Sequence, residues 1–118
     1  MIDDDPQIQT LVRAVALSLK HDTVSAFDAM QGPMLARREK ADLIVLDINM
    51  PGGNGFRLLK QLRGMTETFE TPILVYTSVP RAQVDEMIRE SPITYVLSKP
   101  ATPEQVKDKL NELLAFRG

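Results

Sequence analysis

The chain of 118 residues contains no cysteine and no tryptophan, and it has a single histidine. Without cysteine it can form neither disulfide bonds nor thiolate metal sites. It has no basic block: 14 lysines and arginines stand against 16 acidic residues, which argues against direct binding of nucleic acid. No apolar run approaches the length of a membrane span, and the N-terminus is acidic, unlike that of a signal peptide. We therefore expect a cytoplasmic protein with neither a membrane nor a nucleic acid as partner.

The length and composition are those of an ordinary globular domain. Hydrophobic residues make up 43% of the chain and charged residues 25%. Because 118 residues can bury roughly two thirds of the unfolded surface, we expect one domain over residues 1–118.

The clearest strand signal is the run Leu43–Asp47, where four apolar residues lead directly into a carboxylate. A continuous apolar run is typical of a strand buried on both faces, as in a parallel sheet covered by helices. The proline and three glycines within residues 51–55 stop the strand and predict a tight loop. Asp47 is therefore expected at the carboxyl end of a central strand, where open α/β sheets bind ligands.

Strand and helix patterns alternate along the chain, which predicts an α/β fold with a parallel sheet and right-handed crossovers. The expected strands are Met1–Asp3, Asp22–Phe27, Leu43–Asp47, Ile73–Tyr76 and Tyr95–Ser98. The expected helices are Pro6–Leu19, Gly32–Lys40, Phe56–Leu62, Pro80–Glu90 and Thr102–Phe116. The best-defined helix start is at residues 102–105, where a threonine cap precedes proline and a glutamine at the third position.

Polar side chains end several of these strands. Asp47, Thr77 and Lys99 each follow an apolar strand, and the acidic triplet 3–5 precedes the first helix. Parallel strands end at one edge, so these groups should converge there. Carboxylates about 4 Å apart repel by roughly 4 kcal/mol at an effective dielectric near 20, and they take up a cation or protons. An all-oxygen cluster suits Mg²⁺, and a carboxylate beside Mg²⁺ and a lysine is suited to forming an aspartyl phosphate.

With these residues placed, the chain resembles the receiver domain of two-component response regulators, which has a chemotaxis-regulator-like, flavodoxin-like fold. The resemblance rests on the initial acidic pair, Asp47 before Met50-Pro51 and Gly55, Thr77-Ser78, and Lys99-Pro100. It covers nearly the whole chain, with thirty residues from Asp47 to Thr77 and fifty-two from Asp47 to Lys99. It implies a doubly wound (βα)5 three-layer sandwich with parallel strand order 2-1-3-4-5.

The resemblance also implies roles for the acidic residues. Asp47 would be the phosphoacceptor and would also be among the Mg²⁺ ligands. Asp4 would bind Mg²⁺ directly and Asp3 through water, with the backbone carbonyl of Asn49 as a further ligand.

The remaining site residues would handle the phosphoryl group. Lys99 would contact it, with a cis bond to Pro100, and Thr77 would swing toward a phosphoryl oxygen. Ser78, being small, would leave the site open to a phosphodonor.

Two features depart from the family pattern. Only Met1 and Ile2 precede the acidic pair, so we expect a stunted first strand, with the chain beginning inside that strand or a swapped partner strand completing the sheet. The usual switch aromatic, three residues before the lysine, is Val96 here, and Tyr95 is one residue earlier. A one-residue offset turns a strand side chain to the other face, so Tyr95 is not expected to act with Thr77.

The leading hypothesis is a signal-transduction phosphoprotein that takes a phosphoryl group from a sensor histidine kinase or phosphotransfer protein in a phosphorelay. It would pass the signal to a downstream protein target or to a missing effector domain. It would not be a conventional enzyme, although self-catalysed phosphotransfer and autodephosphorylation are expected. The alternatives are a receiver-like interaction module that is not phosphorylated and, third, a Mg²⁺-dependent phosphohydrolase, for which an evident general acid is missing.

Overall fold

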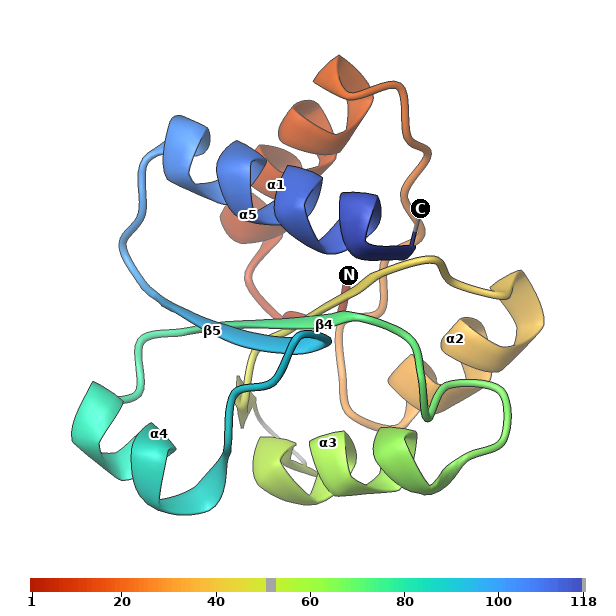
Figure 1. Cartoon of the computed structure of the whole chain (residues 1–118), viewed down its shortest axis with the longest axis vertical. Helices are drawn as coiled ribbons and strands as arrows, with labels where there is room; N and C mark the ends of the chain where they lie inside the picture. Colours follow the sequence, from red (N-terminus) through yellow and green to blue (C-terminus); the bar gives the residue numbers. More distant parts are fainter. Residues whose placement is uncertain (51–52, 118) are drawn as a thin grey trace.

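The computed structural model describes residues 1–50 and 53–117 (Figure 1). For residues 53–54 and 116–117 the description covers the backbone alone. The predicted loop at residues 51–55 therefore lies partly outside the described residues. The elements in chain order are α1 (Pro6–Ser18), α2 (Gln31–Glu39), β1 (Ile44–Leu46), β2 (Asn49–Met50), β3 (Gly53–Asn54), α3 (Gly55–Gly64), β4 (Ile73–Thr77), α4 (Arg81–Met87), β5 (Thr94–Ser98) and α5 (Pro103–Arg117). Among the described residues, no helix is long and apolar enough to cross a membrane.

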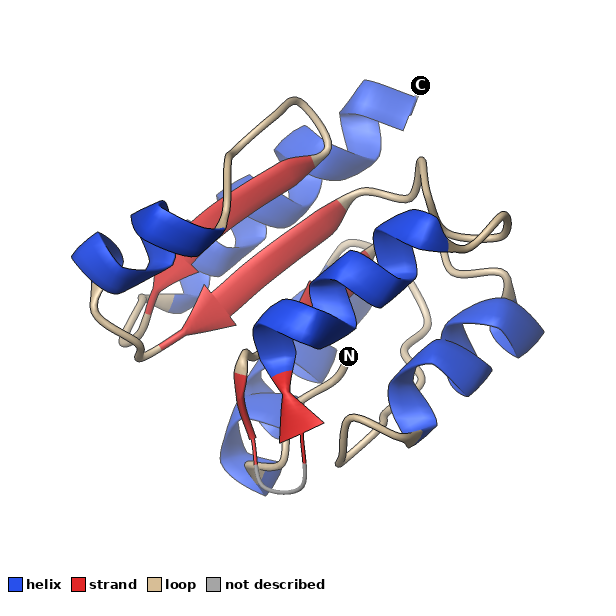
Figure 2. Ribbon diagram, turned by 90° about the horizontal axis from the view of Figure 1, so that it is seen from below, coloured by secondary structure: helices blue, strands red, loops and turns tan. Residues whose placement is uncertain are grey.

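The sheet is parallel, and its order matches the prediction. β4 lies between β1 and β5 and pairs in parallel with both (Figure 2). On the far side of β1, Ile2 forms parallel bridges to Leu46 and to Ala26. Numbering the expected strands along the chain, the spatial order is thus 2-1-3-4-5. The stunted first strand is also confirmed, since it is held as a bridge at Ile2.

Helices cover the two faces of the sheet, with α1 and α5 on one side and α2, α3 and α4 on the other (Figure 1). Alternation along β1 sends Val45 toward the α1–α5 side and Ile44 and Leu46 toward the opposite side. Two apolar clusters result. The first gathers Ile2, Leu46, Leu58, Leu62, Val75, Val84 and Val96, and the second gathers Val12, Val15, Val45, Leu74, Val106 and Leu110.

The predicted helix starts are confirmed in detail. The Asp5 carboxylate accepts a hydrogen bond from the Gln7 amide at 2.8 Å, with Pro6 as the first residue of α1. At α5, the Gln105 amide donates to the Thr102 hydroxyl at 3.1 Å, and the Gln105 side chain accepts from the Thr102 amide at 2.8 Å.

Two predicted elements differ in the structure. The expected strand Asp22–Phe27 is reduced to a bridge at Ala26, because its neighbour, the first strand, is one bridge long. The expected helix Pro80–Glu90 ends at Met87, where Ile88 takes an extended conformation (φ −129°) and turns inward. Met87, the last residue of this helix, is 62% exposed.

A short antiparallel pairing of β2 with β3 follows β1 and was not predicted. It brings α3 back against the end of β1, and the Gly55 amide donates to the Ile48 carbonyl at 3.2 Å. A Cβ at Gly55 would lie 2.1 Å from the Cα of Ile48, so this close approach requires glycine.

Candidate functional site

Asp47 follows β1 at the carboxyl edge of the sheet, as predicted. Its amide donates to the Ile2 carbonyl at 2.9 Å, and its Oδ1 accepts from the Asn49 amide at 3.0 Å. The residue is only 4% exposed. The chain turn after β1 therefore fixes the direction of this carboxylate, while the side chain of Asn49 points to solvent.

The N-terminal acids meet Asp47. Asp3 is fully buried, and its Oδ1 accepts a hydrogen bond from the Asp5 amide at 2.9 Å. Asp4 is exposed. Carboxylate oxygens of Asp3, Asp4 and Asp47 all lie within 4.8 Å of one another, so the structure brings the three predicted acids together.

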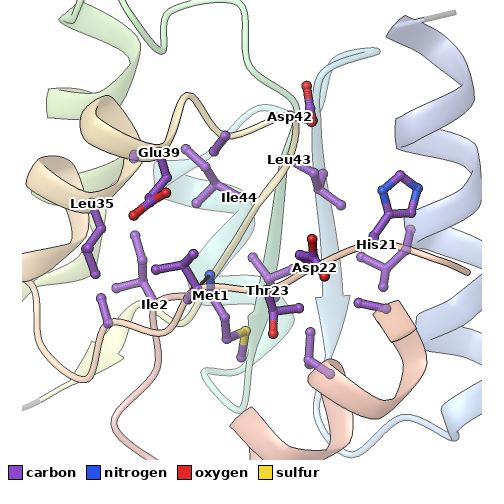
Figure 3. Close-up of a pocket in the computed structure, with 18 of the residues that line it drawn as sticks. Met1, Ile2, His21, Asp22, Thr23, Leu35, Glu39, Asp42, Leu43 and Ile44 are labelled. Atoms are coloured by element: carbon purple, nitrogen blue, oxygen red, sulfur yellow. Dashed lines mark hydrogen bonds between the residues drawn. The ribbon is translucent and has the colours of Figure 1, made fainter. Parts of the chain in front are cut away.

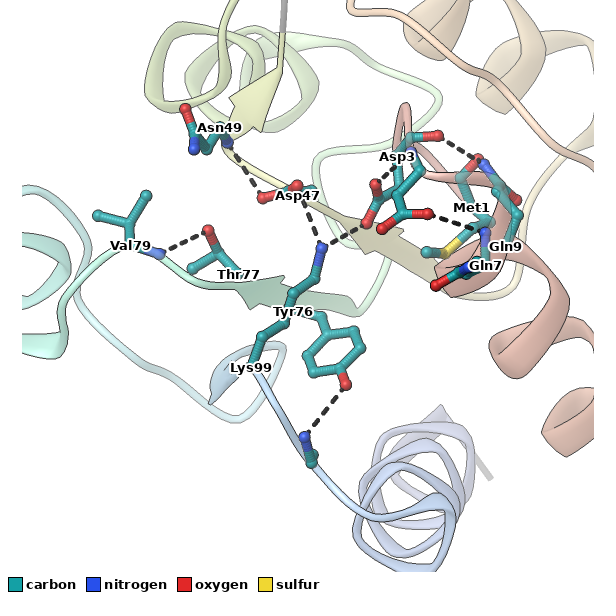
Figure 4. A network of polar contacts seen from close by, with 12 residues as sticks. Met1, Asp3, Gln7, Gln9, Asp47, Asn49, Tyr76, Thr77, Val79 and Lys99 are labelled. Atoms are coloured by element: carbon teal, nitrogen blue, oxygen red, sulfur yellow. Dashed lines mark hydrogen bonds and ion pairs between the residues drawn. The ribbon is translucent and has the colours of Figure 1, made fainter.

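Lys99 joins two of these carboxylates. Its Nζ lies 2.8 Å from Asp3 Oδ2 and 3.2 Å from Asp47 Oδ2 (Figure 4). The backbone amide of Lys99 donates to the Thr77 carbonyl at 2.8 Å, which ties the end of β5 to the end of β4. The bond from Lys99 to Pro100 is cis, as predicted.

The pKa values of Lys99 and Asp3 reflect their burial and the contact between them. Burial opposes the charge on Lys99, but the hydrogen bond to Asp3 and the charges of Asp3 and Asp47 outweigh burial, so the pKa of Lys99 is raised. Burial also raises the pKa of Asp3, and the hydrogen bonds from Lys99 and the Asp5 amide offset this only in part. The contacts with Asp3 and Asp47 thus favour the charged form of Lys99, and a second cation near Asp3 would favour its ionised form.

Thr77 lies at the end of β4 and is fully buried. Its hydroxyl accepts a hydrogen bond from the Val79 amide at 3.2 Å, on the side of the loop that leads to α4 (Figure 4). Ser78 is exposed, as its predicted role requires. Thr77 therefore lies beside the acidic cluster at the carboxyl edge of the sheet. Its hydroxyl is hydrogen-bonded to the loop between β4 and α4.

Gln9 is a site residue that the sequence reasoning missed. Its Nε2 donates to the carbonyls of Asp3 (3.0 Å), Ala26 (3.0 Å) and Met1 (3.3 Å). It thereby holds the short first strand, and Asp3 with it, against α1. Gln9 shares a helix face with Val12 and Ala16 at spacings of three and seven residues, and this spacing could have indicated that it is buried.

The aromatic offset has the predicted consequence. Val96 faces the cluster formed with Val84 and Ile88 and is 2% exposed. Tyr95 faces the other side, where Lys109 Nζ lies 4.2 Å from its ring centroid. Tyr95 is therefore directed toward α5, away from the Thr77–α4 side.

The donor set has the chemistry of a hard-cation site. Three carboxylates meet one ammonium, and no histidine lies among the groups that come together. Oxygen ligands of this kind are those that Mg²⁺ prefers, and it commonly uses one or two carboxylates and keeps several waters. The residues present therefore fit that ion.

A parallel sheet ordered 2-1-3-4-5 with acids and a lysine at its carboxyl edge defines the class of CheY-like receiver domains. The chain belongs to this family: the profile described as response regulator receiver domain matches residues 1–111.

Individual relatives agree with this assignment. Protein PilH of Pseudomonas aeruginosa is 30% identical over 115 residues, which is 98% of this chain and 95% of that protein. The structure of Vibrio cholerae chemotaxis protein CheY4 superposes with a TM-score of 0.85 at 26% identity, covering 95% of this chain and 93% of that one. The receiver domain of the P. aeruginosa sensor histidine kinase PA1611, 22% identical, shares the fold with a TM-score of 0.84, covers 97% and 93%, and holds a magnesium ion in its active-site cleft.

Proposed function

We propose that residues 1–118 act as one receiver domain in which Asp47 accepts a phosphoryl group. The donor is the phosphohistidine of a sensor histidine kinase or phosphotransfer protein. The observation that carries the proposal is the meeting of Asp3, Asp4 and Asp47 with Lys99, from three separate parts of the chain.

Mg²⁺ is the proposed cofactor. Asp4, which is exposed, and Asp47 would hold the ion directly, Asp3 would reach it through water, and the carbonyl of Asn49 would complete the protein ligands. When bound, the ion neutralises the charge on phosphoryl oxygens.

The chain's own residues supply the rest of the reaction. An oxygen of Asp47 attacks the phosphorus, and the P–N bond breaks with its electron pair leaving on the histidine nitrogen. Lys99, already 3.2 Å from Asp47 Oδ2, follows the new negative charge and contacts a phosphoryl oxygen. Thr77 exchanges its bond with the Val79 amide for one with the phosphoryl group.

The output surface is formed by α4, β5 and α5. Moving Thr77 away from Val79 changes the loop that begins α4, and Arg81 connects this helix to β5 by donating to the Val96 carbonyl at 3.2 Å. Arg81 also binds Asp85 at 2.8 Å and pairs with Glu90. Phosphorylation would thus shift an equilibrium at this surface, which a downstream protein or an effector domain reads.

The test is incubation with acetyl phosphate and Mg²⁺, followed by intact mass and peptide mapping. We expect one added phosphoryl group on Asp47, absent from Asp47→Asn and from reactions with chelator. No mass gain, or a gain that survives Asp47→Asn, would refute the proposal.

The second candidate is a receiver-like interaction module that is not phosphorylated. The short first strand at Ile2 and the position of Val96 favour it, because both weaken the usual switch. Titration with Mg²⁺ and beryllofluoride, followed by amide chemical shifts, separates the two. Binding centred on Asp47 supports the switch, and its absence supports the module.

A further inference from the structure

Tyr76 lies on the central strand β4, one residue before Thr77, and is only 1% exposed. Successive residues of a strand face opposite sides of the sheet. The Thr77 hydroxyl therefore bonds to the loop before α4, while Tyr76 belongs to the apolar cluster that contains Val106 and Leu110 of α5. The two neighbours thus lead from the candidate site toward different helices.

The ring of Tyr76 contacts the lysine of the site. The Lys99 Nζ lies 5.4 Å from the ring centroid, which is within the range of a cation–π interaction (Figure 4). The same nitrogen bonds to Asp3 at 2.8 Å and to Asp47 at 3.2 Å. The Lys99 side chain is only 13% exposed, and a cation–π contact is stronger where water is excluded. The ammonium is therefore held by two carboxylates and by one aromatic ring.

The hydroxyl of Tyr76 contacts the start of α5. It accepts a hydrogen bond from the Ala101 amide at 3.3 Å (Figure 4). Ala101 comes directly before Thr102, whose hydroxyl caps α5 by accepting from the Gln105 amide. Because a phenol ring is rigid, a movement of Tyr76 at the ammonium also moves its hydroxyl at the start of α5.

We propose that Tyr76 is a positioning residue that acts through Lys99. Its ring holds the ammonium ready for a phosphoryl group, and its hydroxyl transmits the loading of Asp47 to the start of α5. This role rests on the proposed phosphorylation of Asp47, and it adds a second route beside the one from Thr77 to α4. Val96, at the position of the usual switch aromatic, carries no ring, and the ring that contacts the lysine of this site belongs to Tyr76.

Loading of Asp47 changes the forces on the ammonium. A phosphoryl group carries more negative charge than the carboxylate to which it is joined, and its oxygens lie farther out than those of Asp47. Lys99 moves toward these oxygens and away from the Tyr76 ring. The phenol then changes its position, and its bond with the Ala101 amide changes with it.

Tyrosine fluorescence and amide chemical shifts measure this movement. The chain has no tryptophan and two tyrosines, so Tyr95→Phe leaves Tyr76 as the tyrosine that reports. With Mg²⁺ and beryllofluoride, which mimics a phosphoryl group, we expect the Tyr76 emission and the Ala101 amide resonance to shift. Both should change with the same midpoint as the amide of Asn49 beside the site, and Asp47→Asn should abolish all three changes.

The variant Tyr76→Phe tests the hydroxyl alone. It keeps the ring beside the ammonium and removes the acceptor of the Ala101 amide. The amide of Asn49 should respond to beryllofluoride as in the parent chain, whereas the response of Ala101 should be largely lost.

The variant Tyr76→Leu tests the ring. We expect phosphorylation by acetyl phosphate to slow about threefold to tenfold in Tyr76→Leu and to return to the parent rate in Tyr76→Phe. Tyr95→Leu removes the ring beside Lys109 and is the matched control, with an unchanged rate. Rates are compared at a temperature where circular dichroism shows each chain to be folded.

Failure of this role and failure of the proposed function give different results. No response of Asn49 in the parent chain would overturn both. A response of Asn49 with a silent Ala101 amide would overturn the role of Tyr76 alone, as would equal Ala101 responses in the parent and Tyr76→Phe chains. Equal phosphorylation rates in the parent and Tyr76→Leu chains would also overturn it. If Tyr76→Leu does not fold, the Ala101 response in Tyr76→Phe decides.

Discussion

At the residue scale, the site depends on one ammonium that serves two buried carboxylates. Replacing it by Lys99→Met keeps the length of the side chain and leaves Asp3 and Asp47 facing each other. We expect a loss of about 2–3 kcal/mol in the free energy of unfolding at pH 7, as for a buried charge without its partner. Urea unfolding measures this loss, and Lys109→Met, at the half-buried cation–π contact with Tyr95, is the control.

The loss from Lys99→Met should depend on pH in a definite sense. Burial already raises the pKa of Asp3, and removing the lysine raises it further. A raised folded pKa means that the folded state binds the proton more readily, so acid relieves the repulsion. The deficit should shrink as the pH falls from 7 toward about 4. If the variant loses as much stability near pH 4 as at pH 7, lost packing and not repulsion between carboxylates is the cause.

The Met1 amino group provides a second pH prediction. Burial lowers its pKa from the ordinary 8.0 to about 6. Between these values the unfolded chain binds the proton and the folded chain does not, so the free energy of unfolding should rise with pH, by on the order of 2 kcal/mol from pH 6 to 8. N-acetylation should flatten this rise. Both chains would carry His21→Gln, so that histidine titration does not contribute.

Most of the site residues could be predicted because each is a polar residue at the end of an apolar strand. Asp47 and Lys99 have this pattern, and parallel strands must end together. Gln9 does not, because its partners are backbone carbonyls that meet only after folding. The burial of Thr77 and the direction of its hydroxyl likewise depend on the loop before α4.

At the scale of elements, α1 and the short first strand form one unit through Gln9. Gln9→Met keeps the volume but removes the donor to the carbonyls of Asp3 and Ala26. We expect a loss of about 1–3 kcal/mol in the free energy of unfolding, together with faster exchange of the Asp3 amide. Gln7→Met, on the exposed side of the same helix, is the matched control. Equal losses in the two variants would contradict a role for Gln9 in holding the strand.

Element boundaries could be predicted where local chemistry decides them. The caps at Asp5 and Thr102 are local, and both helices start as expected. The end of α4 is not local, because Ile88 leaves the helix to bury its side chain in the cluster beneath it. The strand expected at residues 22–27 also failed for a non-local reason, since a ladder needs a partner longer than one bridge.

At the scale of the whole molecule, the two ends of the sheet carry opposite features. The carboxyl edge concentrates charge, and the amino edge holds a cavity beside the first strand, lined by residues 22–24 and 42–45 among others (Figure 3). Both are connected through residues 1–4, because Ile2 bridges the neighbouring strands and Asp3 and Asp4 follow directly. Metal binding at the carboxyl edge should therefore be coupled to the free energy of unfolding of the chain.

Mg²⁺ provides the measurement of that coupling. If the ion binds only the folded chain, it should raise the free energy of unfolding by about 2.7 kcal/mol at a concentration of one hundred times Kd.

Asp47→Asn removes one of three mutually repelling carboxylates, so without Mg²⁺ this variant should be at least as stable as the parent chain. In the variant, the stabilisation by Mg²⁺ should be largely lost. Thermal unfolding with Mg²⁺ and with chelator checks both statements, and Asp85→Asn on α4 controls for general effects of acidic residues. A Mg²⁺ effect of equal size in the Asp47→Asn chain would place the ion elsewhere.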